Sequence, residues 1–367
     1  MKLICDKSTL QEGIFTAQKA VTGKSTMPIL LGMLFTASNN ELKITATDLD
    51  LSIETIVKAE IAEEGTVVID ARLIGEIIRK LPNATVEINT LDNNNVEIIC
   101  QKSRFTLLHL NSEDFPKTPI INENMIFSIP QNTLKNMIKS TSFAIAQDET
   151  RPILTGLEFE INAKKLNLVA LDGFRLALRS EYLDTENNIS AVIPGKTLNE
   201  VSKILVDSEK TVNITFTPNH ILFSIEGTKI ISRLLEGEFI KYNSIIPEEY
   251  KVKVIVKRLE LLSCIERASL LAKDGNTNLV KLDIEEDRMV ITSNSQLGMV
   301  REELNLVLQG QPIQIAFNSK YMIDVLKIME EEEIVMELTS NVSPCVIKNV
   351  EENNCKYLIL PVRLLNS

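Results

Sequence analysis

The feature that most constrains this chain is an internal repeat with a constant offset of 124 residues. Residues 26–50, TMPILLGMLFTASNNELKITATDLD, align without a gap to residues 150–174, TRPILTGLEFEINAKKLNLVALDGF. The matched pairs include Pro28 with Pro152, Phe35 with Phe159, Asp48 with Asp172, and Phe115 with Phe239. Agreement at one offset over about 100 positions predicts a duplicated domain of ordinary size.

A third copy follows with weaker similarity. Residues 252–272, VKVIVKRLELLSCIERASLLA, resemble the openings of the first two copies at 1–21 and 125–145. Residues 278–295 take the place of the strand-rich segment, but the proline that precedes it in the first two copies is missing. Three copies fill the chain of 367 residues with little left over. The expected domains are residues 1–121, 122–247 and 248–367.

Each copy shows the same coarse order of elements. An opening strand precedes a helix with apolar residues at i, i+3 and i+4, and strands with polar turns such as SNN and DNNN follow. A second helix and further strands close each copy. The expected helices are 7–20, 70–81, 131–146, 195–206, 257–273 and 318–328. Short connections between strands predict an α+β fold of three tandem domains, each with two helices on antiparallel sheets.

The net charge of −11 conceals an uneven distribution of charge along the chain. The six expected helices together carry a net charge of +8, and the remaining residues carry −19. Solubility of a helix face explains any one helix, but all six share the same bias. A basic surface made of these helices would bind phosphates without reading bases. Since no row of aromatic residues accompanies the helices, recognition of single strands is disfavoured.

The sequence offers little for catalysis. Residues 23–25, Gly-Lys-Ser, match the end of a phosphate-binding loop, but Gln18 stands where that motif requires its first glycine. Asp48 and Asp50 could offer carboxylates to a metal ion, although two acids in a strand turn are more commonly solvated. We therefore expect no catalytic residues, no metal and no cofactor. A P-loop or metal-dependent phosphotransferase is the disfavoured enzyme alternative.

The composition favours a reducing compartment and no membrane anchor. No run of about 18 apolar residues is present, as a membrane-spanning helix would require. The N-terminal segment reaches Asp6 too early for a signal peptide. The five cysteines are scattered without a C-x-x-C pair, which argues against a zinc site and a disulfide framework. We interpret them as core thiols and expect a cytoplasmic protein.

Together these features resemble the family of bacterial DNA polymerase III beta subunits, the replicative sliding clamps. The resemblance covers the full length. Its most specific segments are STMPILLG (25–32), LVALDGFRLA (168–177), GEFIKYNSIIP (237–247) and LPVRL (360–364). It implies three DNA-clamp domains per chain and a head-to-tail homodimer that forms a ring. In this ring, helices line a central hole and a near-continuous antiparallel sheet forms the outer wall.

The resemblance also implies the function and the partners. The ring encircles double-stranded DNA without sequence preference and performs no chemistry of its own. It tethers the replicative DNA polymerase, requires a clamp loader, and binds other polymerases and repair proteins through short peptide motifs. It implies a cytoplasmic, nucleoid-associated protein. A three-repeat scaffold that binds proteins without encircling DNA is the alternative.

The resemblance further implies a partner-peptide cleft between the second and third domains. The matching residues are Leu154, Leu171, Gly173, Phe174, Arg175, Leu176, Ile240, Ser244, Ile245, Leu358, Leu360, Pro361, Val362 and Arg363. Aliphatic walls with a few polar anchors suit a short peptide, although several of these leucines could equally be core residues. Leu171 replaces a common threonine and Ile240 a common proline, so the pocket becomes more apolar. Residues 365–367, Leu-Asn-Ser, extend past the usual end and could shade the mouth of the cleft.

Two further sets of residues follow from the same resemblance. The subunits of the ring join through an apolar contact between a first-domain strand and a third-domain helix end. The matching residues are Phe105, Leu107, Leu270 and Leu271. The DNA-facing residues are Lys24 and Gln147 in corresponding loops, and Arg72 and Lys196 at helix starts. Asp148, and not Gln147, aligns strictly with Lys24, so the lysine itself is not repeated.

Overall fold

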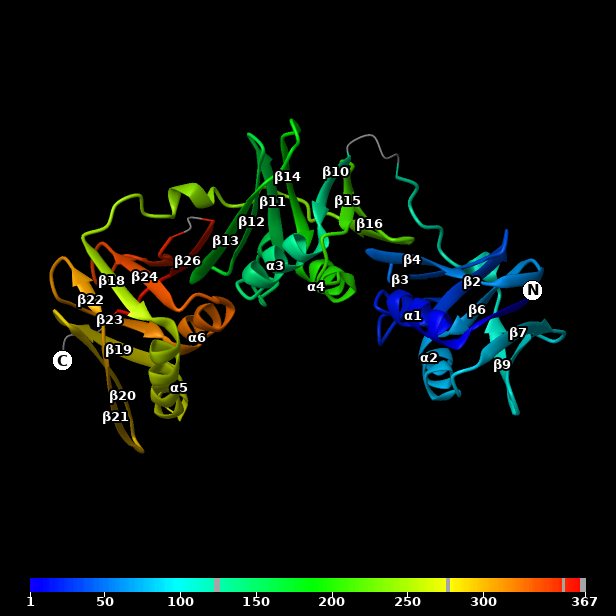
Figure 1. Ribbon diagram of the computed structural model, residues 1–367, viewed down its shortest axis with the longest axis horizontal. Coiled ribbons are helices and arrows are strands. Elements are labelled where there is room, and N and C mark those ends of the chain that lie inside the picture. The colour runs from blue at the N-terminus through cyan, green and yellow to red at the C-terminus, as the bar shows by residue number, and fades with distance from the viewer. Residues whose placement is uncertain (122–125, 275–277, 352–353, 364–367) are drawn as a thin grey trace. The chain divides into compact units, whose positions relative to one another are not determined.

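The computed structural model describes residues 1–121, 126–274, 278–351 and 354–363. All six expected helices are present in these ranges (Figure 1). They are α1 (Lys7–Gln18), α2 (Ala71–Lys80), α3 (Gln131–Ser142), α4 (Gly195–Ile204), α5 (Arg258–Asp274) and α6 (Ser319–Ile328). Four short 3-10 helices are η1 (Pro28–Leu31), η2 (Ser112–Asp114), η3 (Pro152–Thr155) and η4 (Tyr242–Ser244).

The strands follow the three copies of the repeat. The first copy contains β1 (Lys2–Asp6), β2 (Gly32–Ser38), β3 (Glu41–Thr47), β4 (Leu51–Lys58), β5 (Glu60–Glu63), β6 (Gly65–Asp70), β7 (Thr85–Leu91), β8 (Asn95–Cys100) and β9 (Ser103–Leu110). The second contains β10 (Ile126–Pro130), β11 (Gly156–Asn162), β12 (Lys165–Leu171), β13 (Arg175–Tyr182), β14 (Ile189–Pro194), β15 (Thr211–Phe216), β16 (His220–Ile225) and β17 (Thr228–Arg233). The third contains β18 (Val252–Lys257), β19 (Leu279–Ile284), β20 (Arg288–Ser295), β21 (Gly298–Asn305), β22 (Val307–Gln309), β23 (Ile313–Asn318), β24 (Glu333–Leu338), β25 (Cys345–Asn349) and β26 (Cys355–Ile359).

The offset of the sequence repeat is also the offset of the structure. The elements α1, β2, β3, β4 and α2 each begin 124 residues before α3, β11, β12, β13 and α4, respectively. The turn between β2 and β3 has positive φ at Asn39 and Asn40, and its counterpart has positive φ at Ala163 and Lys164. Because even these unusual backbone angles repeat, the two copies share one backbone path and not only a similar hydrophobic pattern.

Two compact units divide the chain. One consists of Met1–Lys135 and Lys196–Leu234, and the other of Asn136–Gly195 and Leu235–Ser367. The first unit contains a 13-stranded sheet in the order β10-β15-β16-β17-β4-β3-β2-β6-β9-β8-β7-β1-β5. The second contains a nine-stranded sheet, β14-β11-β12-β13-β26-β25-β24-β18-β22, and a four-stranded sheet, β21-β20-β19-β23. Helix α1 packs on β3 and β4, and α5 packs on β19, β20 and β21 (Figure 1).

Strand pairing joins neighbouring copies. Strand β17 of the second copy pairs antiparallel with β4 of the first, from Thr228 opposite Thr55 to Ser232 opposite Leu51. Strand β26 of the third copy pairs antiparallel with β13 of the second, as Figure 1 shows. Each of these two joints lies within one compact unit. Backbone hydrogen bonds therefore continue each sheet from one copy into the next.

Local side-chain chemistry sets the helix ends. Helix α1 begins after Asp6, whose carboxylate accepts the backbone N–H groups of Ser8 at 2.8 Å and Thr9 at 3.3 Å. Helix α3 ends at Ser142, four residues before the expected end at residue 146. The hydroxyl of Thr141 donates to the carbonyl of Met137 at 2.8 Å, and tighter turns follow it. Such hydroxyl bonds compete with the helical ladder and explain the earlier end.

The turns at the two copy joints have the same construction. In the first copy, Oδ1 of Asp48 accepts the backbone N–H groups of Asp50 at 3.1 Å and Leu51 at 2.8 Å. In the second, Oδ1 of Asp172 accepts those of Phe174 at 2.9 Å and Arg175 at 3.0 Å. This aspartate-centred turn is a common chain reversal. Asp48, which the sequence offered as a possible metal ligand, therefore has a structural role. Its Oδ1 accepts backbone N–H groups, and its Oδ2 pairs with Lys196.

One position of this turn requires a positive φ. Gly173 has φ +91° in the second copy, whereas Leu49 has φ +83° at the corresponding place in the first copy. A side chain at such an angle strains the backbone, because Cβ crowds the neighbouring carbonyl oxygen. The Leu49 side chain is 53% exposed and recovers little of this cost through burial.

The linker between the second and third copies is fixed by a buried tyrosine. Tyr242, in η4, donates its hydroxyl hydrogen bond to Glu160 and accepts one from Nδ2 of Asn167 at 3.1 Å. Asn167 Nδ2 also donates to Glu160 at 3.1 Å, and Ser180 donates to Oδ1 of Asn167 at 2.7 Å. Burial, followed by the hydrogen bond to Glu160, raises the pKa of Tyr242. The network therefore holds residues 239–246 against the sheet of the second copy.

Replacing Leu49 with glycine should stabilise the protein. We expect the free energy of unfolding to rise by roughly 0.5–1 kcal/mol, because relief of backbone strain exceeds the entropy cost of glycine. The reverse exchange at the matched position, Gly173→Ala, should lower it by a similar amount, since no neighbouring atom restricts a methyl group there. Chemical denaturation of both variants measures these changes in the free energy of unfolding. A destabilised Leu49→Gly variant contradicts the strain argument.

Replacing Tyr242 with phenylalanine should destabilise the protein in a pH-dependent way. Near neutral pH we expect a loss of about 1–2 kcal/mol in the free energy of unfolding, since Glu160 and Asn167 lose a partner. The folded state holds the phenolic proton more tightly than the unfolded chain, whose pKa is about 10. This contribution is complete below that pKa and declines as the pH rises above it.

The difference between wild type and Tyr242→Phe should therefore shrink when denaturation is repeated at about pH 11. Comparing the two proteins at each pH cancels the titration of the other tyrosines and of the cysteines. A difference that is unchanged or larger at alkaline pH contradicts the assigned network.

Candidate functional site

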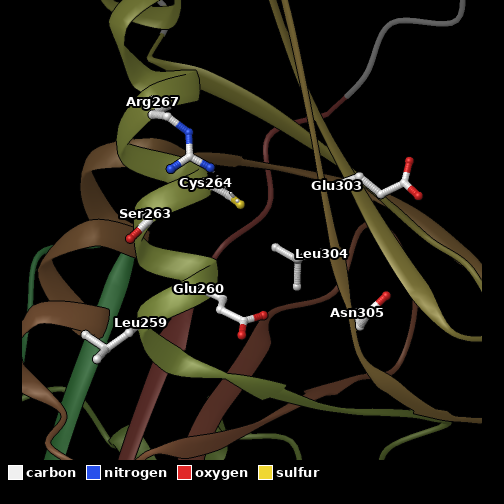
Figure 2. Close-up of a pocket in the computed structure, with 8 residues that line it drawn as sticks. All are labelled: Leu259, Glu260, Ser263, Cys264, Arg267, Glu303, Leu304 and Asn305. Carbon is white, nitrogen blue, oxygen red and sulfur yellow. Dashed lines mark hydrogen bonds between the residues drawn. The ribbon is translucent and has the colours of Figure 1, made fainter.

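The third copy contains a hollow of about 610 Å³ that is large enough to hold a small ligand. Helix α5 and the end of β21 form it, and Figure 2 shows Arg267 directed towards the thiol of Cys264. Burial raises the pKa of Cys264, which leaves little reactive thiolate at neutral pH. The guanidinium of Arg267 is bound to Glu302 by two hydrogen bonds of 2.9 and 2.6 Å. The hollow thus lacks an activated nucleophile.

Two further features bear on function, namely clusters of metal ligands and membrane-spanning helices. In the described ranges, no three His, Cys, Asp or Glu side chains come together as a metal site would require. Among the helices of those ranges, none is long and apolar enough to cross a membrane. All five cysteines are free and buried, as expected.

A row of apolar side chains crosses four neighbouring strands of the second unit. The antiparallel register places Val346 opposite Leu358, Leu358 opposite Leu176, and Leu176 opposite Leu171. Directly opposed residues of adjacent strands project from the same face of a sheet. The four residues therefore form one continuous stripe from β25 to β12, and all four are buried.

This stripe is the centre of a larger apolar cluster. Its buried members are Ala146, Leu154, Val169, Leu171, Leu176, Tyr242, Val346 and Leu358. The half-buried members packed against it are Ile153, Leu178, Phe239, Ile240 and Ile246. The structure thus brings together five of the predicted cleft residues, namely Leu154, Leu171, Leu176, Ile240 and Leu358. Segments of both the second and third copies contribute.

Some members of the cluster could have been found from the sequence and others could not. Val169 and Leu178 lie two positions from Leu171 and Leu176 on the same strands, so strand periodicity places them on the same face. Val346 belongs to a strand that the sequence does not connect to β13, and only the pairing register reveals it. The sequence places Tyr242 in a linker, and only its hydrogen bonds with Glu160 and Asn167 show that it has a structural role.

The remaining predicted cleft residues surround the cluster near the surface. Phe174 is 59% exposed, and Leu360 and Val362 are 36% and 37% exposed. The N–H of Leu360 donates to the carbonyl of Phe174 at 2.8 Å, and the N–H of Val362 donates to Ala316 in β23 at 2.8 Å. Gly173, Ser244, Ile245 and Arg363 are exposed, and Pro361 is half-buried. The expected terminal extension, 365–367, lies outside the described residues.

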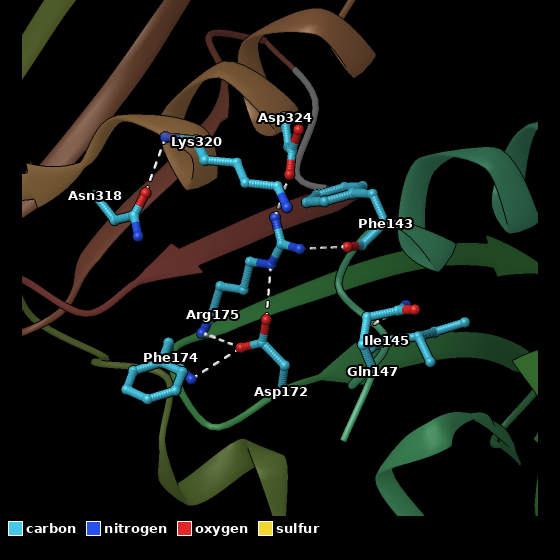
Figure 3. A network of polar contacts seen from close by, with 9 residues as sticks. All are labelled: Phe143, Ile145, Gln147, Asp172, Phe174, Arg175, Asn318, Lys320 and Asp324. Atoms are coloured by element: carbon cyan, nitrogen blue, oxygen red, sulfur yellow. Dashed lines mark hydrogen bonds and ion pairs between the residues drawn. The ribbon is translucent and has the colours of Figure 1, made fainter. Parts of the chain in front are cut away.

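Arg175 is not an exposed anchor but the centre of a polar network (Figure 3). Its side chain is 9% exposed. Nε donates to Asp172 at 2.9 Å, Nη1 to Asp324 of α6 at 2.6 Å, and Nη2 to the carbonyl of Phe143 at 2.6 Å. The guanidinium carbon lies 5.3 Å from the ring centre of Phe143 and 4.6 Å from that of Tyr321. The second and third copies are therefore joined by charge-assisted bonds beside the cluster.

The four predicted DNA-facing residues are exposed in loops or at helix starts. Lys24 is exposed in the loop after α1, and Arg72 is exposed as the second residue of α2. Gln147 is exposed in the loop after α3. Lys196 is the second residue of α4, and its ammonium group pairs with the carboxylate of Asp48. A phosphate that approaches Lys196 must therefore compete with a carboxylate, whereas within the described residues Lys24 and Arg72 form no ion pair.

The predicted subunit contacts lie on two exposed apolar surfaces. Phe105 is exposed and Leu107 half-buried on β9, whose residues 103–108 are paired with β8 on one side. Leu270 is exposed and Leu271 half-buried near the end of α5. Strand β21 is the edge of its four-stranded sheet. An edge strand beside exposed leucines presents unpaired backbone groups that a second chain can pair with.

Comparison with known proteins identifies the family. Models of the N-terminal, central and C-terminal domains of the DNA polymerase III beta subunit match residues 1–119, 128–241 and 243–363. The beta sliding clamp of Bacillus subtilis is 38% identical over 99% of this chain and 100% of its own length.

Solved structures agree with the sequence comparison. The crystal structure of the Bacillus subtilis DNA polymerase sliding clamp has a TM-score of 0.97 at 38% identity, with 100% of both chains covered. A putative DNA polymerase III beta subunit from Eubacterium rectale has a TM-score of 0.95 at 39% identity, with 99% of each chain covered. The resemblance expected from the sequence is confirmed, and this chain belongs to the family of DNA polymerase III beta subunits, the bacterial sliding clamps.

Proposed function

We propose that this chain serves as the sliding clamp of its replication machinery. As a member of the beta subunit family, it is a non-catalytic processivity factor that acts as a homodimeric ring on DNA and binds the polymerase. The observation that carries the proposal is the match to the family in all three copies. The scaffold without DNA encirclement is not favoured.

The mechanism is tethering. A polymerase held to a ring around its template has a high effective concentration at the primer end after each release. Sliding requires weak, exchangeable contacts to the DNA backbone, because base-specific contacts would hold the ring in place. We propose Lys24, Arg72, Gln147 and Lys196 as such contacts. Their exposure, and the scarcity of rigid partners around Lys24 and Arg72, support this assignment.

We propose that partners bind at the apolar cluster of the second and third copies. Aliphatic side chains around the stripe from Val346 to Leu171 suit a short peptide with leucine or aromatic side chains. Leu171 has no hydroxyl group, and Ile240 has no proline ring. The peptide should therefore be held through apolar contacts alone at these two positions. The exposed side chains of Phe174, Leu360 and Val362 supply the rim.

Subunit contacts, domain limits and location are further parts of the proposal. Phe105 and Leu107 of one chain would meet Leu270 and Leu271 of the next in a head-to-tail ring. The domains are placed at 1–121, 122–247 and 248–367, with residues 122–125 outside the described ranges. We place the protein in the cytoplasm, associated with the nucleoid, because its proposed ligand is the chromosome.

A primer-extension assay tests the function. On primed circular DNA, this protein with its clamp loader and polymerase should lengthen the products of a single binding event by at least about tenfold, because tethering replaces dissociation with rebinding. Linearising the template should abolish the gain, since a ring slides off a free end. Equal gains on linear and circular templates would support the scaffold alternative instead.

A truncation tests the peptide cleft separately. Removing residues 361–367 deletes the N–H of Val362 that donates to Ala316, and should abolish polymerase binding. The dimer should remain intact, because Phe105, Leu107, Leu270 and Leu271 are unaffected. Peptide titration and sedimentation of the same sample measure both outcomes. An unchanged peptide affinity contradicts the placement of the cleft.

A further inference from the structure

We propose that Arg175 is a positioning residue that fixes the rim of the partner-peptide cleft, and that it does not itself bind a charge on the peptide. The inference rests on the proposed function of the cleft. It assigns a role to the one charged side chain that the cleft buries.

The geometry leaves Arg175 little capacity for a ligand. Its three nitrogens each donate to a protein oxygen, at 2.9 Å to Asp172, 2.6 Å to Asp324 and 2.6 Å to Phe143. The rings of Phe143 and Tyr321 lie near the guanidinium carbon. Binding a peptide carboxylate would require breaking charge-assisted bonds that are already desolvated, which is costly.

The partners of Arg175 come from three separate segments. Phe143 follows the last turn of α3, Asp172 begins the turn after β12, and Asp324 lies on α6 of the third copy (Figure 3). Binding to the carbonyl of Phe143 satisfies a backbone acceptor just beyond the end of α3. Arg175 thus fixes the distance between two helices and the turn that carries the rim.

The rim residues depend directly on this arrangement. Phe174 precedes Arg175 and stacks on Tyr321 with ring centres 6.2 Å apart. The carbonyl of Phe174 accepts the N–H of Leu360, the residue that leads into the exposed tail. A displacement of Arg175 therefore moves the side chain of Phe174 and the start of the tail at Leu360 together, although both of these residues are uncharged.

The first copy provides an internal comparison. Leu51 occupies the position of Arg175 and is buried, yet the turn around Asp48 has the same hydrogen bonds as the turn around Asp172. The free oxygen of Asp48 instead pairs with Lys196. The turn therefore folds without an arginine, so Arg175 is not needed for the turn itself.

The apolar row is interrupted at the joint of the first copy. Thr47 and Ser52 stand where the second copy has Leu171 and Leu176, and their hydroxyls bond to each other at 2.8 Å. The arginine and the uninterrupted apolar row thus occur together at one joint. The other joint has Leu51 in place of the arginine, and two of its four row positions, Thr47 and Ser52, are polar beside the buried Ile231 and Leu222. This pairing assigns Arg175 to the cleft and not to the general fold.

The experiment compares two peptides on four proteins. Amidated, acetylated Ser-Leu-Asp-Leu-Phe and its neutral counterpart with Asn in place of Asp are titrated by fluorescence anisotropy. The proteins are the full-length wild type, Arg175→Lys, Asp324→Asn and the control Arg179→Lys. Arg179 lies on the same strand, pairs with Glu181 at 2.7 Å and reaches Asn354 of the third copy at 3.3 Å.

Arg175→Lys and Asp324→Asn should each weaken both peptides by about tenfold. The ratio of the two affinities should stay that of the wild type, because the arginine acts through the shape of the rim. A fifth protein, the double variant, should lose little more than Arg175→Lys alone, because Arg175→Lys already breaks the bond between Arg175 and Asp324. Arg179→Lys should bind as the wild type does.

Two outcomes would overturn the inference. If only the acidic peptide is weakened, Arg175 binds the peptide charge directly. If both variants bind like the wild type, the network is not needed for the rim. A wild type that binds neither peptide contradicts the proposed cleft instead. Thermal denaturation checks folding, and if Arg175→Lys is unstable, the isosteric Asp324→Asn on the helix surface provides the test.

Discussion

The pairing of β13 with β26 is the interaction on which the candidate site depends. It places Leu176 of the second copy opposite Leu358 of the third, and a slip of one residue would turn every side chain of the slipped strand to the other face. The register thereby assembles an apolar surface from strands about 180 residues apart in the sequence. The ion pair between Arg175 and Asp324 adds a second connection between the same two copies. Side-chain and backbone contacts thus specify a single arrangement there.

Much of the fold could be predicted because its signals are local. Helix periodicity and turn residues lie within a copy, and the constant offset shows that the copies share one backbone path. The end of α3 was predicted four residues too late, because the bond from Thr141 to Met137 leaves no trace in hydrophobic periodicity. Val346 and the bond from Arg175 to Asp324 could not be predicted either. Their role depends on strand order and on contacts between copies, which no short segment encodes.

The electrostatics of the chain illustrate how side-chain pairing modifies a charge pattern. The helices are net cationic, but part of that charge is already engaged within the protein. Arg79 pairs with Glu76 and Lys203 with Glu200 on their own helices, while Lys196 pairs with Asp48. Such exposed pairs contribute little to stability, and salt weakens them further. What remains is a net positive charge spread over the separate helices, which suits a protein that must move along DNA.

The hydroxyl pair of Thr47 and Ser52 has a consequence for how many partner proteins can bind the clamp at once. Two joints of each chain share one backbone frame, but at the first joint Thr47 and Ser52 place hydroxyl groups where the second joint has Leu171 and Leu176. With the proposed cleft at the second joint alone, a ring of two chains would present two such clefts, however many proteins require one. Partners would then bind in turn, in an order set by their local abundance and by their rates of dissociation.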